Sequence, residues 1–196
     1  MAAFILASQS PRRKQLLEWA ELPFTVMVSD TDESYPSSLP IGEVPAYIAK
    51  HKALAVEAHL GLEQSSNVAP CIIAADTVVV LDQTIMGKPL DRADAIASLT
   101  KLSGNTHEVI TGVCLLYAGQ EICFSETTKV SFHTLTQEQI EFYVDTYKPY
   151  DKAGGYAIQE WIGVVGIQRI EGDFYNVMGL PVSKLVQKIK QLGLLD

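Results

Sequence analysis

The chain has 196 residues, of which 47% are hydrophobic and 19% are charged, and its 15 Lys and Arg against 23 Asp and Glu give a net charge of −8. This composition excludes intrinsic disorder, and the length is that of one globular domain with a core that needs no disulfide or structural metal. The acidic charge argues against nucleic acid or an anionic membrane as the main partner, although a few local cations suffice to bind a small anion.

Strands and helices alternate in the first half of the chain. Ser10 and Pro11 are typical of the N-cap and the first residue of a helix, and Asp91 has the same capping role for a later helix. Gly104 follows this later helix as a C-terminal stop. The predicted elements are the strands Phe4–Ala7, Phe24–Val28 and Cys71–Leu81, the helices Arg12–Ala20 and Val44–His59, a hairpin near Asp82 and Gln83, and a helix that ends near Leu102.

The second half begins with two long apolar segments that a Gly-containing turn joins in a hairpin. Thr136 and Gln139 then form a capping box for a helix. The predicted elements are the strands His107–Tyr117 and Ile122–Phe132, a helix to about Thr146, a Gly-rich loop Lys148–Tyr156, a strand Gly163–Ile170, an extended segment Phe174–Met178 and a last amphipathic helix that begins at Pro181. This order of elements predicts an α/β domain with a mixed sheet.

Membrane and secretory segments are not expected. No apolar run approaches the ~18 residues of a membrane span, and Met1–Ala7 lacks the cationic region and the length of a signal peptide. Cys71, Cys114 and Cys123 occur in apolar, strand-like segments, and none of them lies in a CxxC pair. We therefore expect a cytoplasmic protein whose three cysteines are buried, reduced thiols.

Two arginines occupy an unusual position at the start of the first predicted helix. Arg12 and Arg13 stand in its first turn, where the helix dipole disfavours cations. Ser8 and Ser10 supply hydroxyl groups next to them, and an anion bound at this helix N-terminus would make the arrangement favourable. The alternative is that both arginines are solvated surface residues, and this segment alone favours neither interpretation.

A carboxylate interrupts the most apolar segment of the chain. Asp76 lies within Cys71–Leu81, and burial of a carboxylate is costly unless it is paired or bound to a metal. A turn Asp at a strand end is the alternative, but valines resume at Val78, so we favour a functional role. Glu33 lies in an acidic loop that by itself is typical of a solvated charge cluster; Mg²⁺, however, takes one or two protein carboxylates together with phosphate oxygens.

Two lysines and one loop add weaker signals. Lys52 in a predicted helix and Lys88 in a Gly-Lys-Pro turn are surface residues by default. The Gly-rich segment Asp151–Gln159 is typical of a loop that surrounds a ligand, although loops of this composition are common. Together with the arginines and carboxylates, these residues predict an α/β enzyme that binds an anionic small molecule through a metal.

Seven sequence blocks, in order, resemble the signature segments of the Maf family of nucleoside triphosphate pyrophosphatases. The blocks are Leu6–Arg13, Ile48–Ala53, Ala74–Val79, Gly87–Pro89, Leu102–Val109, Asp151–Tyr156 and Gly172–Pro181. Their combination is far more specific than any single block, and it extends over nearly the whole chain. The resemblance implies a single domain over residues 1–196, with an elongated mixed β-sheet in two lobes around a central cleft, similar to inosine triphosphate pyrophosphatase.

The resemblance also implies an activity. Maf-family enzymes hydrolyse nucleoside triphosphates to the monophosphate and pyrophosphate with a divalent metal cation, Mg²⁺ or Mn²⁺, and form homodimers. The segment Asp151–Gln159 resembles the subgroup that acts on dTTP and UTP, with modified pyrimidine nucleotides as further substrates. Two alternatives stay open: a nucleotide-binding regulator of cell division or septum formation, and a pyrophosphatase specific for 7-methyl-GTP.

The same resemblance assigns roles to residues. Asp76 is the proton acceptor and a metal ligand, and Glu33 is a second carboxylate of the metal site. Thr77 and Gln159, together with Arg12, match positions that determine substrate choice, and a Gln amide offers the donor and the acceptor that the imide edge of uracil or thymine needs. The implied phosphate-binding residues are Ser8, Arg12, Arg13, Lys52 and Lys88.

Overall fold

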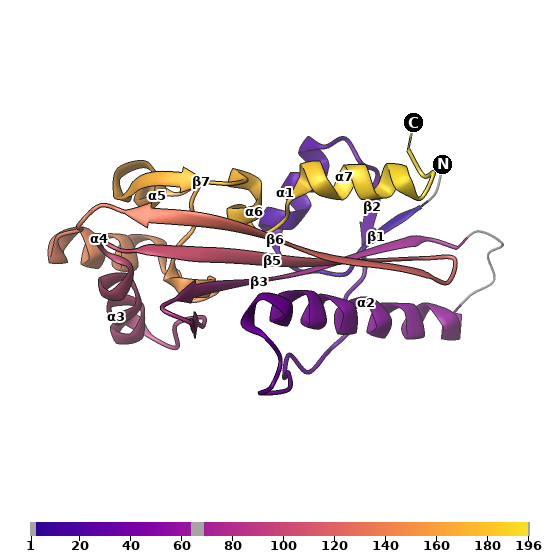
Figure 1. Cartoon of the computed structure of the whole chain (residues 1–196), viewed down its shortest axis with the longest axis horizontal. Helices are drawn as coiled ribbons and strands as arrows, with labels where there is room; N and C mark the ends of the chain where they lie inside the picture. Colours follow the sequence, from indigo (N-terminus) through magenta and orange to yellow (C-terminus); the bar gives the residue numbers. More distant parts are fainter. Residues whose placement is uncertain (1–2, 64–68, 196) are drawn as a thin grey trace. The chain divides into compact units, whose positions relative to one another are not determined.

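The computed structural model describes residues 3–63 and 69–195. Within these residues, seven strands form one mixed sheet in the order β2-β1-β3-β5-β6-β7, with β4 paired to β3 (Figure 1). The strands are β1 (Phe4–Leu6), β2 (Phe24–Val26), β3 (Cys71–Leu81), β4 (Thr84–Met86), β5 (Thr106–Tyr117), β6 (Gln120–Phe132) and β7 (Ile167–Glu171). The helices are α1 (Pro11–Trp19), α2 (Val44–Glu63), α3 (Arg92–Leu102), α4 (Gln137–Tyr147), α5 (Trp161–Gly166), α6 (Phe174–Met178) and α7 (Val182–Gln191), with short 3-10 turns at Ile41–Glu43 and Ala153–Gly155. The predicted α/β class with a mixed sheet is confirmed.

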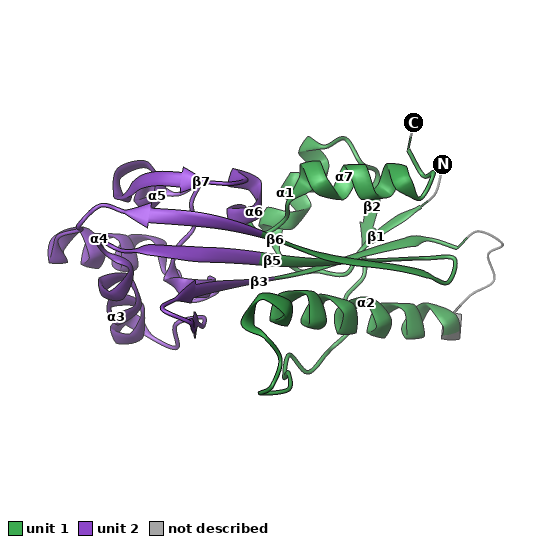
Figure 2. Ribbon diagram, in the orientation of Figure 1, with its two compact units in different colours: residues 1–76, 111–126, 179–196 green, residues 77–110, 127–178 purple. Residues whose placement is uncertain are grey.

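The chain divides into two compact units, each assembled from separated segments (Figure 2). Unit 1 comprises Met1–Asp76, Thr111–Glu126 and Gly179–Asp196, and unit 2 comprises Thr77–Ile110 and Thr127–Met178. Helices α1, α2 and α7 therefore belong to unit 1, and α3 to α6 belong to unit 2.

In unit 1, β1 runs parallel to both β2 and β3. Alternate residues of β1, β3 and β5 point to one face of the sheet, where they form a buried cluster with residues of α2. The cluster comprises Ile5, Ala7, Ala49, Ala53, Val56, Ile72, Ala74, Cys114 and Leu116. Small residues permit a close approach of helix and sheet here: a Cβ atom at Gly112 of β5 would lie 2.0 Å from the backbone nitrogen of Ala46.

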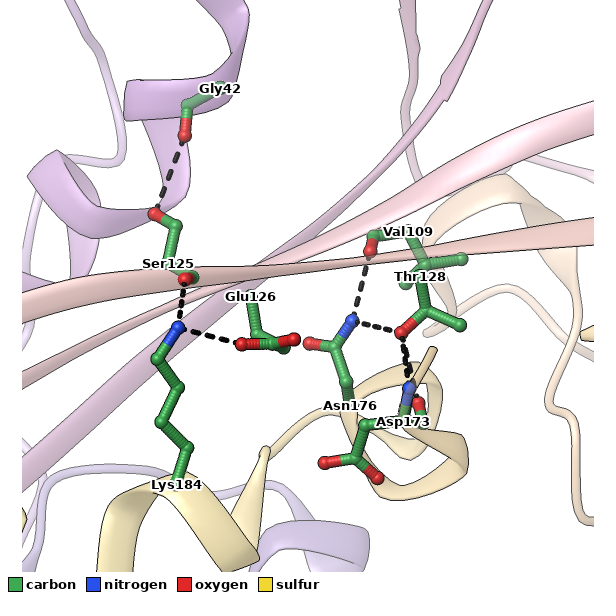
Figure 3. Close-up of polar contacts among 8 residues, drawn as sticks. All are labelled: Gly42, Val109, Ser125, Glu126, Thr128, Asp173, Asn176 and Lys184. Atoms are coloured by element: carbon green, nitrogen blue, oxygen red, sulfur yellow. Dashed lines mark hydrogen bonds and ion pairs between the residues drawn. The ribbon is translucent and has the colours of Figure 1, made fainter. Parts of the chain in front are cut away.

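Helices α1 and α7 lie on the other side of the unit 1 strands from α2 (Figure 2). Helix α1 begins as predicted, because the Ser10 hydroxyl accepts a hydrogen bond from the backbone N–H of Arg13, and Pro11 is its first residue. Helix α7 is joined to β6 by Lys184, whose Nζ lies 2.7 Å from Glu126 Oε2 and 3.0 Å from the carbonyl oxygen of Ser125 (Figure 3). This ion pair holds the C-terminal helix on its strand.

In unit 2, α3 and α4 pack together and are linked by a bidentate ion pair. Arg92 donates to both carboxylate oxygens of Asp145, at 2.6 and 2.8 Å. The predicted caps are confirmed: Asp91 accepts from the backbone N–H of Asp94, and Thr136 forms the capping box with Gln139. The predicted hairpin after β3 is also confirmed, since β4 pairs antiparallel with β3.

The prediction of a strand over Gly163–Ile170 was wrong in its first half. Residues Trp161–Gly166 form helix α5, and the strand β7 begins only at Ile167. Short apolar runs do not distinguish a strand from a helix, and here Ile162 and Gly166 are buried four residues apart, as on one face of a helix, while Val164 is 80% exposed.

The predicted extended segment Phe174–Met178 was also wrong, because it forms helix α6. Asp173 starts this helix by accepting the backbone N–H of Tyr175 at 2.8 Å. The helix places Asn176 in the interior of unit 2, where its Nδ2 donates to the carbonyl oxygen of Val109 and to Thr128 Oγ1 (Figure 3). These buried bonds require the helical turn, and they involve residues far away in the sequence.

Candidate functional site

Six of the predicted site residues belong to unit 1: Ser8, Arg12, Arg13, Glu33, Lys52 and Asp76. Asp76 lies inside β3 and not in a turn at its end, so the turn interpretation was wrong. Its side chain is only 15% exposed. A carboxylate at such a position needs a partner, and the structure provides one from helix α2.

The partner is Lys52, which joins the two predicted metal-site carboxylates. Its Nζ lies 2.7 Å from Asp76 Oδ1 and 2.7 Å from Glu33 Oε1. Asp76 comes from a strand and Glu33 from the loop after β2, so two distant segments converge on one cationic atom. The Lys52 and Asp76 side chains are 16% and 15% exposed, which strengthens their ion pair relative to a pair at a fully solvated surface, whereas Glu33 is 51% exposed.

This convergence meets the first requirement of a divalent cation site. Oxygen atoms of Asp76 and Glu33 face the same positive centre, and Mg²⁺ is typically bound by one or two carboxylates together with phosphate oxygens and water. The described residues contain no cluster of three or more His, Cys, Asp or Glu that could hold a metal. The two carboxylates on one positive centre fit a cation that takes its other ligands from a phosphate-bearing substrate and water.

Arg13 is buried and fixed at the start of helix α1. Its Nε donates to the carbonyl oxygen of Gly179 at 2.8 Å, and its Nη1 donates to Ser8 Oγ at 3.1 Å. Burial lowers the pKa of Arg13, and the negative charge of Asp76 opposes that shift. Ser8 Oγ also accepts the backbone N–H of Ser10 at 3.2 Å, so Ser8 orients Arg13 and retains only its hydroxyl proton as a donor.

The other predicted site residues, Thr77, Lys88 and Gln159, belong to unit 2. Thr77 is half-buried on β3, and Gln159 is exposed in the segment before α5. Lys88 is exposed in the turn after β4. It lines a cavity of about 180 Å³ whose wall also includes Ser98 and Lys101.

The segment that presents Gln159 is held by a buried polar cluster that sequence reasoning missed. The hydroxyl group of Tyr143 accepts the backbone N–H of Ala157 at 3.1 Å and donates to the Glu160 carboxylate. Lys152 is buried, and its Nζ lies 3.6 Å from Glu160 Oε1. The sequence pattern did not identify Tyr143 as part of this cluster, because a tyrosine on the apolar face of a predicted helix cannot be distinguished from an ordinary core residue.

Comparisons with known proteins find relatives along nearly the whole chain. A family model described as Maf-like protein matches residues 3–192. A dTTP/UTP pyrophosphatase of Parabacteroides distasonis is 48% identical over 187 residues, which is 95% of this chain and 94% of the relative. A dTTP/UTP pyrophosphatase of Porphyromonas gingivalis is 48% identical over 190 residues, which is 96% of this chain and 94% of the relative.

One solved structure overlaps with this fold. The Ham1 protein of Staphylococcus aureus superposes with a TM-score of 0.45 and 12% sequence identity, over 66% of this chain and 71% of that chain. An overlap of this extent supports no argument about function.

Proposed function

The chain belongs to the Maf-like protein family, and from this membership we propose that it is a nucleoside triphosphate pyrophosphatase that hydrolyses dTTP and UTP to the monophosphate and pyrophosphate. The observation that carries the proposal is 48% identity to dTTP/UTP pyrophosphatases along 95–96% of the chain. The convergence of Asp76, Glu33 and Lys52 supports it independently, because hydrolysis of an anhydride needs a proton acceptor next to positive charge.

The proposed site residues have distinct roles in this reaction. Asp76 accepts the proton of the water that attacks the α-phosphorus, since its carboxylate is ordered and hardly solvated. Arg12 and Arg13, at the N-terminus of α1, bind phosphate oxygens, and the bonds from Arg13 to Gly179 and Ser8 hold its side chain in place. Lys52 and Lys88 supply further positive charge for the leaving pyrophosphate.

The proposal includes a divalent cation, Mg²⁺ or Mn²⁺, which Asp76 and Glu33 would hold. When bound, the cation neutralises charge on the phosphate oxygens that develops during attack. The proposal also includes a homodimer, which rests on the family resemblance, and a cytoplasmic location, which rests on the sequence pattern. Within the described residues, 3–63 and 69–195, no helix is both long enough and apolar enough to cross a membrane.

Substrate choice is assigned to Gln159, with Thr77 and Arg12. The Gln159 amide matches the acceptor and donor pattern of the uracil and thymine imide edge. Its segment is fixed by Tyr143 and Glu160, so the amide is presented by a structured segment and not by a mobile loop. Fixed hydrogen-bonding groups discriminate strongly against bases that leave them unpaired.

A nucleotide panel tests the activity. Purified protein with Mg²⁺ or Mn²⁺ is incubated with dTTP, UTP, CTP, GTP and 7-methyl-GTP, with and without added inorganic pyrophosphatase. Phosphate should appear from dTTP and UTP only when the pyrophosphatase is added, because the primary product is pyrophosphate. Phosphate release without the added enzyme, or a preference for 7-methyl-GTP, would overturn the proposal.

The same panel tests the specificity role with a matched pair of variants. Gln159→Ala should reduce the preference for dTTP and UTP over CTP by about tenfold, the equivalent of one hydrogen bond, with a smaller effect on the maximal rate. Gln168→Ala removes another exposed glutamine of unit 2, on β7, and should leave the preference unchanged. An equal loss of activity on every nucleotide in Gln159→Ala would assign this residue a structural task instead.

A further inference from the structure

Two thiols lie side by side on the β5–β6 hairpin of unit 1, and neither belongs to the residues assigned to catalysis. Cys114 of β5 and Cys123 of β6 have their Sγ atoms 2.6 Å apart, within hydrogen-bonding distance. The expectation that all three cysteines are buried was wrong for Cys123, which is exposed, whereas Cys71 and Cys114 are buried. The pair thus combines one accessible thiol with one in the interior.

The hairpin between β5 and β6 determines how the two cysteines face each other. Its turn consists of Ala118 and Gly119, both with positive φ (48° and 77°), as in the tight turns that join antiparallel strands. Tyr117 and Gln120 close the turn, and the fourth pair outward, counted from this closing pair as the first, places Cys114 opposite Cys123. Because the pair that closes the turn exchanges hydrogen bonds and the pairs alternate, this is a non-hydrogen-bonded pair, with Cα atoms ~4.5 Å apart. Disulfides span ~4.4–6.8 Å between Cα atoms.

The two thiols differ in chemical character. The hydrogen bond with Cys114 lowers the pKa of Cys123 and the cation of Lys50 acts in the same direction, while burial and the Glu121 carboxylate oppose this shift. The same hydrogen bond and burial raise the pKa of Cys114. Lys50 is held near the pair by Glu121, at 2.8 Å, and Cys123 Sγ lies 3.8 Å from the same Glu121 oxygen. An accessible thiol of lowered pKa next to a buried thiol of raised pKa is the arrangement of an attacking and a resolving cysteine.

We propose that Cys114 and Cys123 form a reversible intramolecular disulfide, so that the β5–β6 hairpin is a site of thiol–disulfide exchange with low-molecular-weight disulfides such as oxidised glutathione. The Cys123 thiolate attacks one sulfur of glutathione disulfide, the S–S bond breaks, and one glutathione leaves and takes up a proton. Cys114 then loses its proton and attacks Cys123 Sγ, which releases the second glutathione as a thiol. Two protein thiols are oxidised, and one glutathione disulfide is reduced to two thiols.

The groups around the two cysteines favour thiol–disulfide exchange over metal binding. Cys114, Cys123 and Glu121 are the groups gathered here, and in the described part of the chain no three His, Cys, Asp or Glu residues are arranged to hold a metal. Stable thiolate sites usually offer four ligands. Because the two strands are already paired, the disulfide forms without displacement of the backbone.

Peptide mapping tests the proposal. The folded protein is incubated with oxidised glutathione, quenched with acid, alkylated and cleaved after glutamate, which places Cys114 and Cys123 on separate peptides because Glu121 lies between them. The expected product is a cross-link of these two peptides that dithiothreitol removes, with Cys71 still free. Cys71 is the internal control, because burial raises its pKa to about 12.

A pair of single variants makes the outcome decisive. In Cys114→Ser the resolving thiol is absent, so Cys123 should keep a stable glutathione adduct. In Cys123→Ser, Cys114 should stay unmodified because it is buried. Three free thiols in the wild-type protein after incubation, or a lasting glutathione adduct on wild-type Cys123, would overturn the proposal. These readouts do not depend on nucleotide hydrolysis.

Discussion

Lys52 stands between the two carboxylates of the proposed metal site. The sequence presents it as a helical lysine with a family-derived role in binding phosphate, whereas in the structure its ammonium group contacts Asp76 and Glu33 at 2.7 Å each. An ammonium group and a divalent cation cannot share these carboxylate oxygens without strong repulsion. A metal bound at the proposed site would therefore compete with Lys52 for the same negative charge.

Removal of this ammonium group should strengthen metal binding. In Lys52→Met the side chain keeps its approximate length but loses its charge, so we expect Mn²⁺ to bind the nucleotide-free protein about tenfold more tightly, the equivalent of ~1.4 kcal/mol. Titration calorimetry or Mn²⁺ electron paramagnetic resonance measures this affinity directly. Turnover should fall in the same variant, because a proposed phosphate-binding cation is lost.

Lys50→Met is the matched control. Lys50 lies one half-turn earlier on α2 and pairs with Glu121 at 2.8 Å, with both side chains about 40% exposed. Its loss should leave the Mn²⁺ affinity unchanged. Equal affinity in Lys52→Met and the wild-type protein would show that Asp76 and Glu33 do not bind the cation together.

The residues of the site differ in how far the sequence predicts them. Asp76 was predictable because a carboxylate inside an apolar strand needs an explanation. The sequence did not predict that Arg13 is anchored by the carbonyl oxygen of Gly179, because Gly179 lies 166 residues away. The same holds for Tyr143, whose role depends on contacts that local patterns do not contain.

At the scale of elements, strand β5 carries a buried histidine that links unit 2 stability to pH. Burial lowers the pKa of His107 to about 4, from an ordinary value of 6.5, and His107 Nε2 lies 2.7 Å from the hydroxyl of Tyr156. Between these two pH values the unfolded chain binds the proton and the folded chain does not. Stability is therefore full above pH 6.5 and falls as the pH drops toward 4, by roughly 3 kcal/mol at most.

Urea unfolding at pH 7 and pH 4.5 measures this contribution. His107→Gln cannot take up the proton in this range, so its stability should fall less between the two pH values than that of the wild-type protein. His133→Gln alters an exposed histidine that follows β6 and should reproduce the wild-type pH dependence. Parallel pH profiles for wild-type protein and His107→Gln would contradict this role.

Elements with strong local signals were predicted correctly. Helices α1, α3 and α4 begin at the expected caps, since a cap is formed by side chains within a few residues. Helices α5 and α6 were missed because each is stabilised by tertiary contacts. Gly166 of α5, for example, packs so closely against distant side chains that a Cβ atom would lie 3.1 Å from Leu135 Cδ2 and 3.3 Å from Phe132 Cε1.

At the scale of the whole molecule, the sequence predicts the class of the fold but not its assembly. The mixed sheet follows from the alternation of elements, whereas the strand order brings β1 next to β3 and the C-terminal residues 179–196 into the same unit as the N-terminus. Local periodicity does not encode such long-range neighbours. The central cleft and the homodimer stay predictions that rest on the family resemblance.

The most direct test of the proposed reaction is phosphorus NMR of dTTP hydrolysis in ¹⁸O-labelled water. Attack at the α-phosphorus predicts labelled dTMP and unlabelled pyrophosphate, with a rate about 10²–10⁴-fold lower in Asp76→Asn, whose side chain cannot accept the proton. That variant should stay folded, because Lys52 keeps Glu33 as a partner. Label in pyrophosphate, release of orthophosphate with dTDP, or undiminished turnover in Asp76→Asn would contradict the account.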